Sequence, residues 1–198
     1  MSQQVAILFA RADSIYKTLP GCDVWDAERD ALKWPGGSPI VAHPPCRAWG
    51  ALRQFAHPMP GERELALWAV DRVREFGGVL EHPAGSTLWK AKRLPRPGDS
   101  DQFSGRCIAI NQWDFGHRAQ KRTWLYAVGI HWGDFLRVPK RAGIVTHVIT
   151  HAHGKRKGDS GWRPRVTNAE REHTPIELAK WLVEVARRCE TVEALRTP

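Results

Sequence analysis

A strand, a helix and a second strand in close succession constrain the fold of this chain more than any other feature. Three apolar residues, Ile40–Ala42, are soon followed by a Pro-Pro pair, and proline offers no N–H to a strand ladder. Residues 62–76 repeat apolar side chains at intervals of three and four, begin with acids and end at Gly77-Gly78, which predicts a helix. Val79-Leu80 form the second strand. A helix that joins two strands in this way places them parallel in one sheet, so the unit predicts an α/β fold.

Further strand-like and helix-like segments lie on both sides of this unit. We expect other strands at residues 5–10, 22–25, 107–110, 123–128 and 144–149. Thr174, Pro175 and Glu177 match a capping box, and the helix that they begin is expected to run to about Arg188. Segments 90–105 and 154–168 predict surface loops, the second of them mobile and basic. With 198 residues, the chain is long enough for one domain and too short for two, so we expect a single compact domain over 1–198, a mostly parallel sheet flanked by helices.

Positive charge is concentrated in one part of the sequence. The formal net charge is +9, and residues 117–171 hold twelve Lys and Arg against three Asp and Glu, which accounts for the whole excess. Localised positive charge on an otherwise balanced chain favours a polyanionic partner, most simply a nucleic acid such as DNA. A solvated basic face without a partner is the alternative.

The cysteines and the apolar runs bear on where the protein works. Four widely spaced cysteines, with no Cys-x-x-Cys pair, fit a reducing, cytoplasmic setting better than a disulfide scaffold. The first residues carry no basic segment, and no apolar run approaches the about 18 residues that a membrane span needs. We therefore expect a cytoplasmic protein that does not enter a membrane.

Cys46 is the residue that most invites a chemical interpretation. It follows strand 40–42 and the Pro44-Pro45 turn, and a rigid turn of this kind would present its thiol at the carboxyl end of a buried strand. In open α/β sheets, ligands bind in the crevice outside that edge. Cys46 is therefore a candidate nucleophile, and a structural cysteine beside the turn is the alternative.

Three short motifs now stand in an order that resembles one enzyme family. Pro44-Pro45-Cys46 follows one strand, Glu81-His82-Pro83 follows the next, and Gly116 with Gln120-Lys121-Arg122 precedes another. The DNA cytosine-5 methyltransferases order a Pro-Cys motif, a Glu-Asn-Val motif and a Gln-x-Arg-x-Arg motif along an α/β sheet in the same sequence. Residues 174–181 are also similar to the last helix of that family. The resemblance covers most of the chain and implies a Rossmann-like fold of the methyltransferase type.

The resemblance implies catalytic roles for Cys46, Glu81 and Arg122. A thiolate that adds to C6 of cytosine turns the ring into an enamine, whose C5 attacks an electrophile, so Cys46 would be the nucleophile. Glu81, protonated or sharing a proton, would neutralise the charge that develops at N3. Arg122 would hold the carbonyl oxygen of the base and lower the pKa of the thiol. The base would have to be flipped or single-stranded. Glu81 as a capping or ion-paired carboxylate and Arg122 as one more basic residue are the structural alternatives.

The region that would bind S-adenosylmethionine departs from the family pattern. The family has a Phe-x-Gly-x-Gly turn after its first strand, whereas Phe9 is followed by Ala-Arg-Ala and Asp13, so no glycine allows the cofactor a close approach. Glu28 and Asp30 lie like the acidic residues that end the family's second strand. Only residues 31–39 separate them from the strand before Cys46, so the family's next strand and its acidic contact are missing. The candidate cofactor residues are Phe9, Asp13, Glu28 and Asp30.

The base-binding and nucleic-acid-binding motifs depart from the family as well. His82-Pro83 replaces Asn-Val, Trp124 replaces the second arginine of the Gln-x-Arg-x-Arg motif, and the chain has no room for the family's target-recognition region. Trp162, in the basic loop, is a candidate for base stacking. The candidate substrate-binding residues are Pro45, Trp49, Gln120, Lys155, Arg156 and Lys157.

Three histidines, His147, His151 and His153, have a spacing that a metal site could use. They run into a basic loop and have no companion carboxylate nearby. Nucleic-acid contact or solvent exposure is therefore the favoured interpretation, and we predict no metal ligands.

Three functions remain open from the sequence. The first is a compact cytosine-5 methyltransferase that uses S-adenosylmethionine. The second is an enzyme that keeps Cys46 and Glu81 but modifies or removes a pyrimidine base without this cofactor. The third is a non-catalytic nucleic-acid-binding protein. A pure binder gains nothing from a nucleophile, which argues against the third, and the altered turn of residues 9–13 argues against the first.

Overall fold

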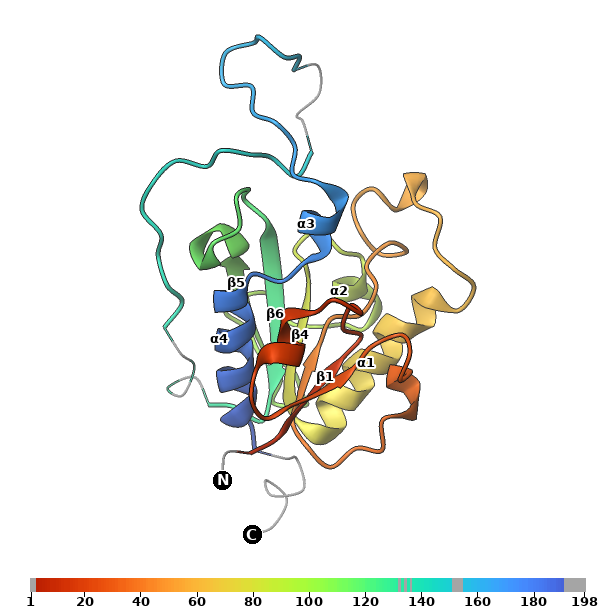
Figure 1. Cartoon of the computed structure of the whole chain (residues 1–198). Coiled ribbons are helices and arrows are strands. Elements are labelled where there is room, and N and C mark those ends of the chain that lie inside the picture. The colour runs from red at the N-terminus through yellow and green to blue at the C-terminus, as the bar shows by residue number, and fades with distance from the viewer. Residues whose placement is uncertain (1–2, 132, 134, 136, 151–154, 191–198) are drawn as a thin grey trace.

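Six strands form one mixed sheet with helices on both faces (Figure 1). The structure is a computed structural model, and it describes residues 3–131, 133, 135, 137–150 and 155–190. The strands stand in the sheet in the order β2 Cys22–Trp25, β1 Val5–Leu8, β3 Ile40–Ala42, β4 Gly78–Pro83, β6 Arg122–Val128 and β5 Arg106–Asn111. The chain therefore forms a single α/β domain, as the strand-helix-strand unit predicts.

The pairing of the strands is parallel in one half of the sheet and antiparallel in the other. β1 pairs in parallel with β2 and β3, and β3 pairs in parallel with β4. β6 lies between β4 and β5 and is antiparallel to both. The prediction of a mostly parallel sheet holds for β1 to β4. It fails for β5 and β6, because the connection between them is short and turns the chain back, so that the two strands run in opposite directions.

The helices confirm some of the predicted boundaries and correct others. The strand-helix-strand unit contains α1 Glu62–Phe76, as predicted. The others are α2 Leu88–Ala91, α3 Asn168–Glu172 and α4 Ile176–Arg187, with 3-10 turns η1 Ile15–Thr18, η2 Ala31–Lys33, η3 Arg53–Phe55 and η4 Gln112–Phe115. The predicted capping box of α4 does not form, because its N-cap is Pro175 and no side chain caps it. No described helix is long and apolar enough to cross a membrane.

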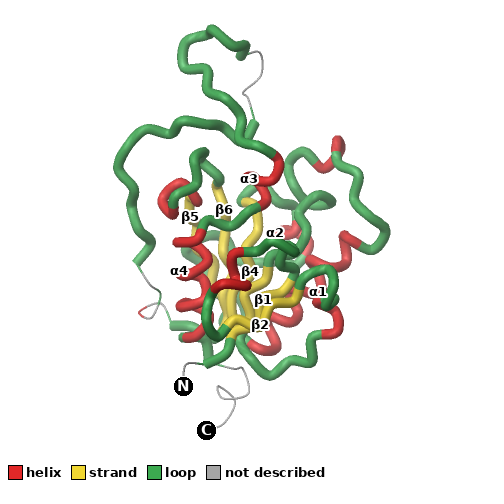
Figure 2. The backbone as a smooth tube through the Cα atoms, in the orientation of Figure 1, coloured by secondary structure: helices red, strands yellow, loops and turns green. Residues whose placement is uncertain are grey.

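The long connection from β6 to α3 holds no regular strand among its described residues. The strand predicted at 144–149 is reduced to isolated bridges, from Ala119 to His147 and from Val148 to Arg165. Ile144 is largely exposed, so this segment lacks the buried face that would hold it in a sheet. Figure 2 shows the connection passing along the α4 side of the molecule and over the end of the sheet where α3 lies.

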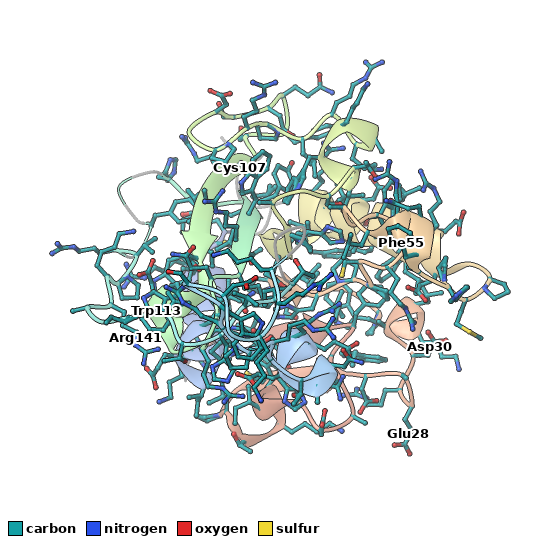
Figure 3. The ribbon with its side chains drawn as sticks, turned by 90° about the horizontal axis from the view of Figure 1, so that it is seen from above. Glu28, Asp30, Phe55, Cys107, Trp113 and Arg141 are labelled. Atoms are coloured by element: carbon teal, nitrogen blue, oxygen red, sulfur yellow. The ribbon has the colours of Figure 1, made fainter. Side chains whose placement is uncertain are left out.

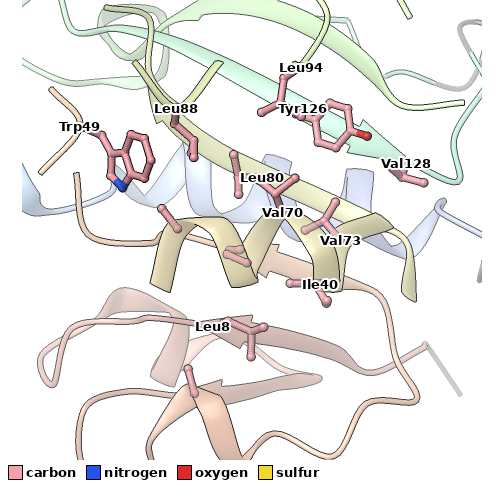
Figure 4. Close-up of a cluster of buried hydrophobic side chains, with 14 of the residues drawn as sticks. Leu8, Ile40, Trp49, Val70, Val73, Leu80, Leu88, Leu94, Tyr126 and Val128 are labelled. Carbon is pink, nitrogen blue, oxygen red and sulfur yellow. The ribbon is translucent and has the colours of Figure 1, made fainter. Parts of the chain in front are cut away.

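The sheet is covered by an apolar layer on each face. On one face, Leu8, Ile40 and Leu80 from neighbouring strands contact Val70 and Val73 of α1 (Figure 4). The side chains that alternate with them face α4 instead, and those of the strands include Ile7, Val41, Val79 and Leu125. This alternation decides on which face each later residue of a strand lies.

Gly78 shows how closely β3 and β4 approach each other. Its φ is +117°, and a Cβ at this position would lie 2.1 Å from the carbonyl oxygen of Ile40. The glycine pair therefore does more than end α1, because it also allows β4 to start against β3.

The strand order reverses between β1 and β3. From β1 the chain passes to β2 on one side, and from β2 it crosses to β3 on the other side of β1. In open α/β sheets, the crevice outside the carboxyl ends of two such strands is the usual ligand site. The segments that leave β1 and β3 at this point begin with Phe9 and His43.

Candidate functional site

The centre of the candidate site is a hydrogen-bonded pair at the carboxyl ends of β3 and β4. His43 directly follows β3, and Nδ1 of its ring lies 3.0 Å from Oε2 of Glu81 in β4. Both side chains are 12% exposed. They meet because His43 stands two residues after Val41 and Glu81 two residues after Val79, so both point to the α4 face of the sheet. Glu81 lies within the strand, not after it as the sequence suggested.

Further polar side chains complete a buried network around this pair. The hydroxyl of Tyr16, on η1, lies 2.9 Å from Nε2 of His43. Nε2 of Gln112, on η4, donates to Oε1 of Glu81 and to Oγ1 of Thr123, each at 3.1 Å. Both oxygens of the Glu81 carboxylate therefore have a partner, and Tyr16 and Thr123 hold those two partners in turn.

Glu81 is ionised in this setting. Burial opposes the charge, but the hydrogen bond from His43 and the attraction of Lys121, His43 and His82 outweigh it and lower the pKa of Glu81 to about 2. In the free protein Glu81 is therefore a carboxylate that shares the hydrogen of His43, rather than a protonated carboxyl. A carboxylate only accepts hydrogen bonds, so Nδ1 of His43 carries the hydrogen between them.

Cys46 is exposed on the turn that follows β3 and shares the electrostatic surroundings of Glu81. Removal of water from around the sulfur and the negative charge of Glu81 raise the pKa of the thiol, while Lys121 and Arg171 act in the opposite direction. The free protein therefore holds a thiol rather than a preformed thiolate. The expectation that Arg122 lowers the pKa of this cysteine is wrong, because the neighbouring cations are Lys121 and Arg171.

Arg122 lies on the other face of the sheet. Leu125 pairs with Glu81 across β6 and β4 and faces α4, whereas Trp124 packs on the α1 side. Alternation places Arg122 on the same side as Trp124, and its side chain is exposed. The structure thus separates Arg122 from Glu81 and brings Lys121 to the site in its place.

Trp49 is unavailable as a stacking platform. It belongs to the buried cluster of Figure 4 and is 1% exposed. Its Nε1 donates to the carbonyl of Arg63 at 3.1 Å, and the guanidinium of Arg63 covers the ring at 3.9 Å. The turn after Cys46 curls inward, since the carbonyl of Cys46 accepts from the N–H groups of Trp49 and Gly50. Of the other predicted contacts, Pro45 is half-buried in the turn and Gln120 is exposed.

The segment that follows Cys46 is held at both ends by one ion pair. Arg47 donates to both carboxylate oxygens of Glu62, at 2.9 and 2.6 Å, and Glu62 is 4% exposed although it is the first residue of α1. Between these anchors the segment presents apolar side chains to solvent, including Phe55 at 74% exposure.

The segment around α3 lies against the turn after β1. Arg11 pairs with Glu172 and Asp13, and Nε2 of His173 lies 3.0 Å from the carboxylate of Asp13. The hydrogen bond from Arg11 lowers the pKa of Asp13 to about 2. Arg171, on the same helix, is one of the cations near Cys46. Asp13 is thus part of the contact that holds α3 at the site.

The structure does not bring the four predicted cofactor residues together. Phe9 has a φ of +61° and lies edge-on to Trp68, with 5.9 Å between the ring centroids. Glu28 is exposed at the periphery and Asp30 caps η2 by accepting from the N–H of Leu32 (Figure 3).

The first acid after β2 is Asp26, which directly follows the strand but is not among the predicted cofactor residues. It is 5% exposed and accepts from Nζ of Lys17 at 2.7 Å and from two backbone N–H groups. Since Lys17 already neutralises Asp26 and Arg11 fills the turn after β1 with an ion-paired side chain, these residues do not fit S-adenosylmethionine as they stand.

The basic loop carries exposed cations before α3. Lys155, Arg156 and Lys157 are exposed, and Nζ of Lys155 donates to the carbonyl of Ser160 at 3.1 Å. His147 is hydrogen-bonded to Arg118 and Thr146, while His151 and His153 lie outside the described residues. Within the described part of the chain, no group of three His, Cys, Asp or Glu side chains could hold a metal ion.

Comparisons with known proteins leave the function to be argued from this geometry. No protein-family model matches the chain, and no curated protein matches it.

The site therefore combines an exposed thiol, an ionised carboxylate and nearby cations at one edge of the sheet. The residues missed from the sequence are Tyr16, His43, Gln112, Lys121 and Thr123. His43 could have been found, because it continues the apolar alternation of β3 by one further step. Tyr16 and Gln112 lie on 3-10 turns far away in sequence, and no local pattern marks them.

Proposed function

We propose that the protein is a DNA-modifying enzyme of the cytosine-5 methyltransferase type, in which Cys46 adds to C6 of a cytosine and a group is then transferred to C5. The observation that supports this most is the placement of Cys46 and Glu81. Cys46 follows β3, and Glu81 lies in the carboxyl-terminal half of the neighbouring parallel strand β4. The charge of Glu81 acts on the thiol, and the cysteine is accessible. A nucleophile and a proton-handling carboxylate at the ligand-binding edge are the minimum that this chemistry needs.

The ionisation states suggest a route for the proton. The Cys46 thiol is protonated and the Glu81 carboxylate is charged, so the thiol proton passes to Glu81 as the sulfur attacks. The new bond joins Sγ to C6, the C5=C6 electron pair moves between C5 and C4, and the C4=N3 pair moves onto N3. N3 then takes the proton from Glu81, which leaves C5 nucleophilic. After transfer to C5, water takes the C5 proton, and the C5–H electron pair restores C5=C6 and expels the thiolate. The N3 proton returns through Glu81 to the sulfur, which regenerates the thiol.

Two features of the fold support a Rossmann-like, methyltransferase-type arrangement. The strand order reverses between β1 and β3, and the candidate catalytic residues lie at the carboxyl ends of β3 and β4, next to that reversal. S-adenosylmethionine remains the proposed group donor, although the turn after β1 would have to release the Arg11 ion pairs to admit it. Calorimetric titration with the cofactor tests this part separately.

The charge distribution supports a nucleic-acid substrate. Lys and Arg outnumber Asp and Glu in the connection between β6 and α3. This connection passes over the end of the sheet where α3 lies (Figure 1). Arg171 and Lys121 extend that charge to Cys46 itself. A cytosine inside a duplex cannot reach the thiol, so the substrate base is flipped out or single-stranded.

Hydrogen exchange at C5 of cytosine tests the covalent step without any group donor. Addition of the thiol makes C5 take up a proton from solvent, so DNA incubated with the protein in deuterium oxide gains deuterium at this carbon. Mass spectrometry of the nucleosides measures it. Exchange is expected with wild type and with Cys22→Ala, a matched loss of a half-buried cysteine, and not with Cys46→Ala. Equal exchange by Cys46→Ala would remove Cys46 from the mechanism.

A second function, base modification without S-adenosylmethionine, is favoured by the poor fit of the turn after β1. The two are separated by nucleoside spectra recorded with and without the cofactor. Methylcytosine that forms only with it supports the first function, and a changed or missing base in its absence supports the second. DNA binding without exchange or product would leave a non-catalytic binding protein.

A further inference from the structure

Three side chains form a hydrogen-bonded row that ends on the candidate catalytic carboxylate. The hydroxyl of Tyr16 lies 2.9 Å from Nε2 of His43, and Nδ1 of His43 lies 3.0 Å from Oε2 of Glu81. Tyr16 is 1% exposed and packs against the His43 ring with 5.4 Å between the ring centroids. Both nitrogens of the imidazole are thus used inside the protein.

We propose that His43 is a positioning residue, which holds the Glu81 carboxylate in one orientation and keeps it ready to take the proton of the Cys46 thiol and deliver it to N3 of the base. The inference rests on the proposed function. In this role His43 contacts neither the base nor the group donor and acts only through Glu81.

The direction of the hydrogen bonds supports this role. Glu81 accepts, so Nδ1 of His43 donates, and the hydroxyl of Tyr16 bonds the other ring nitrogen, Nε2. Tyr16 therefore holds the ring so that its Nδ1–H points at Glu81. Gln112 fixes the other carboxylate oxygen at 3.1 Å, which leaves the plane of the carboxylate little freedom.

The charges around Glu81 show what the histidine contributes. Burial alone would raise the pKa of this carboxyl, and His43 provides the largest of the contributions that lower it, ahead of the charges of Lys121 and His82. The other facing titratable groups are the Cys46 thiol and Tyr16, and burial, followed by the negative charge of Glu81, raises the pKa of both. Without the hydrogen bond from His43, burial raises the pKa of Glu81. The carboxyl is then protonated at a higher pH, and in that state it cannot accept the thiol proton.

The test measures the rate of C5 hydrogen exchange on a cytosine oligonucleotide as a function of pH, together with the affinity for that oligonucleotide. For His43→Leu we expect a rate loss of at least about tenfold near neutral pH with unchanged affinity. The acid limb of its pH profile should move up by about one unit or more. His43→Asn, whose amide N–H can replace Nδ1–H, should recover most of the rate and the wild-type limb. His131→Leu, a matched change at an exposed histidine outside the network, should behave as wild type.

The outcomes distinguish this inference from the proposed function. Absence of exchange by wild type contradicts the proposed function, but the ¹⁵N shifts of His43 still report on the network. A hydrogen on Nδ1 in wild type supports the positioning role, and a hydrogen on Nε2 alone overturns it. If wild type exchanges, a His43→Leu profile equal to wild type overturns the inference. Should His43→Leu fail to fold by circular dichroism, His43→Asn and Tyr16→Phe decide. A normal rate and pH profile for Tyr16→Phe together with an inactive His43→Asn would overturn it.

Discussion

The dependence of stability on pH should carry the signature of one buried carboxylate. The pKa of Glu81 is lowered to about 2 in the folded protein, against an ordinary value of 4.5. A lowered folded-state pKa stabilises the protein above the unfolded value and loses that contribution as pH falls through the folded value. Stabilisation from Glu81 is therefore complete above about pH 5 and lost by about pH 2. The gap corresponds to about 3 kcal/mol of unfolding free energy.

Urea unfolding of wild type and Glu81→Gln at a series of pH values measures this contribution. The glutamine cannot titrate, so the difference in unfolding free energy between the two proteins should shrink by about 3 kcal/mol between pH 6 and pH 2. Other acids titrate in both proteins and cancel in the comparison. Glu28→Gln, at an exposed position, is the matched control and should follow wild type. A difference that stays constant with pH would refute the reasoning, since Glu81 would then titrate alike in both states.

Three further predictions concern the surroundings of the site. Lys121→Met should raise the pKa of Cys46 and slow its alkylation by iodoacetamide about two- to fivefold, whereas Arg122→Met should leave the rate unchanged; the reverse would restore Arg122 to the site. Neutralising residues 155–157 should weaken DNA binding and reduce its log-log salt slope by ~1 per lost phosphate contact, and unchanged binding would place the nucleic acid elsewhere. Arg47→Ala should lower the unfolding free energy by about 1–2 kcal/mol, because it leaves a buried glutamate without its cation, and an unaltered urea midpoint would argue against this anchor.

The part of the site that local patterns specify could be predicted. Strand β3, helix α1 and strand β4 each show their own periodicity in a short stretch of sequence, and their order implied parallel pairing. That pairing was enough to bring the segments that carry Cys46 and Glu81 to one edge of the sheet. The same patterns could not assign Lys121 over Arg122, since a step of one residue at the start of β6 moves a side chain to the opposite face.

The ionisation states could not be predicted from the motifs. A glutamate after an apolar run is compatible with a neutral or a charged carboxyl, and burial alone favours the neutral form. The outcome depends on His43, Lys121 and Gln112, which three different segments bring to the carboxylate. Likewise, the exposed Cys46 and the buried Trp49 differ because the turn between them curls inward, a consequence of its contacts with Arg63 and α1.

The sequence by itself determined the α/β class, the parallel unit of β3, α1 and β4, and the placement of a thiol at the end of a strand, because each depends on residues only a few positions apart. Only the tertiary structure decided that β6 enters the sheet antiparallel, that Tyr16, His43 and Gln112 surround Glu81, and that the carboxyl is ionised. These properties arise from charges and hydrogen bonds between distant segments, whose energies depend on burial and on distances of about 3 Å that no local pattern encodes.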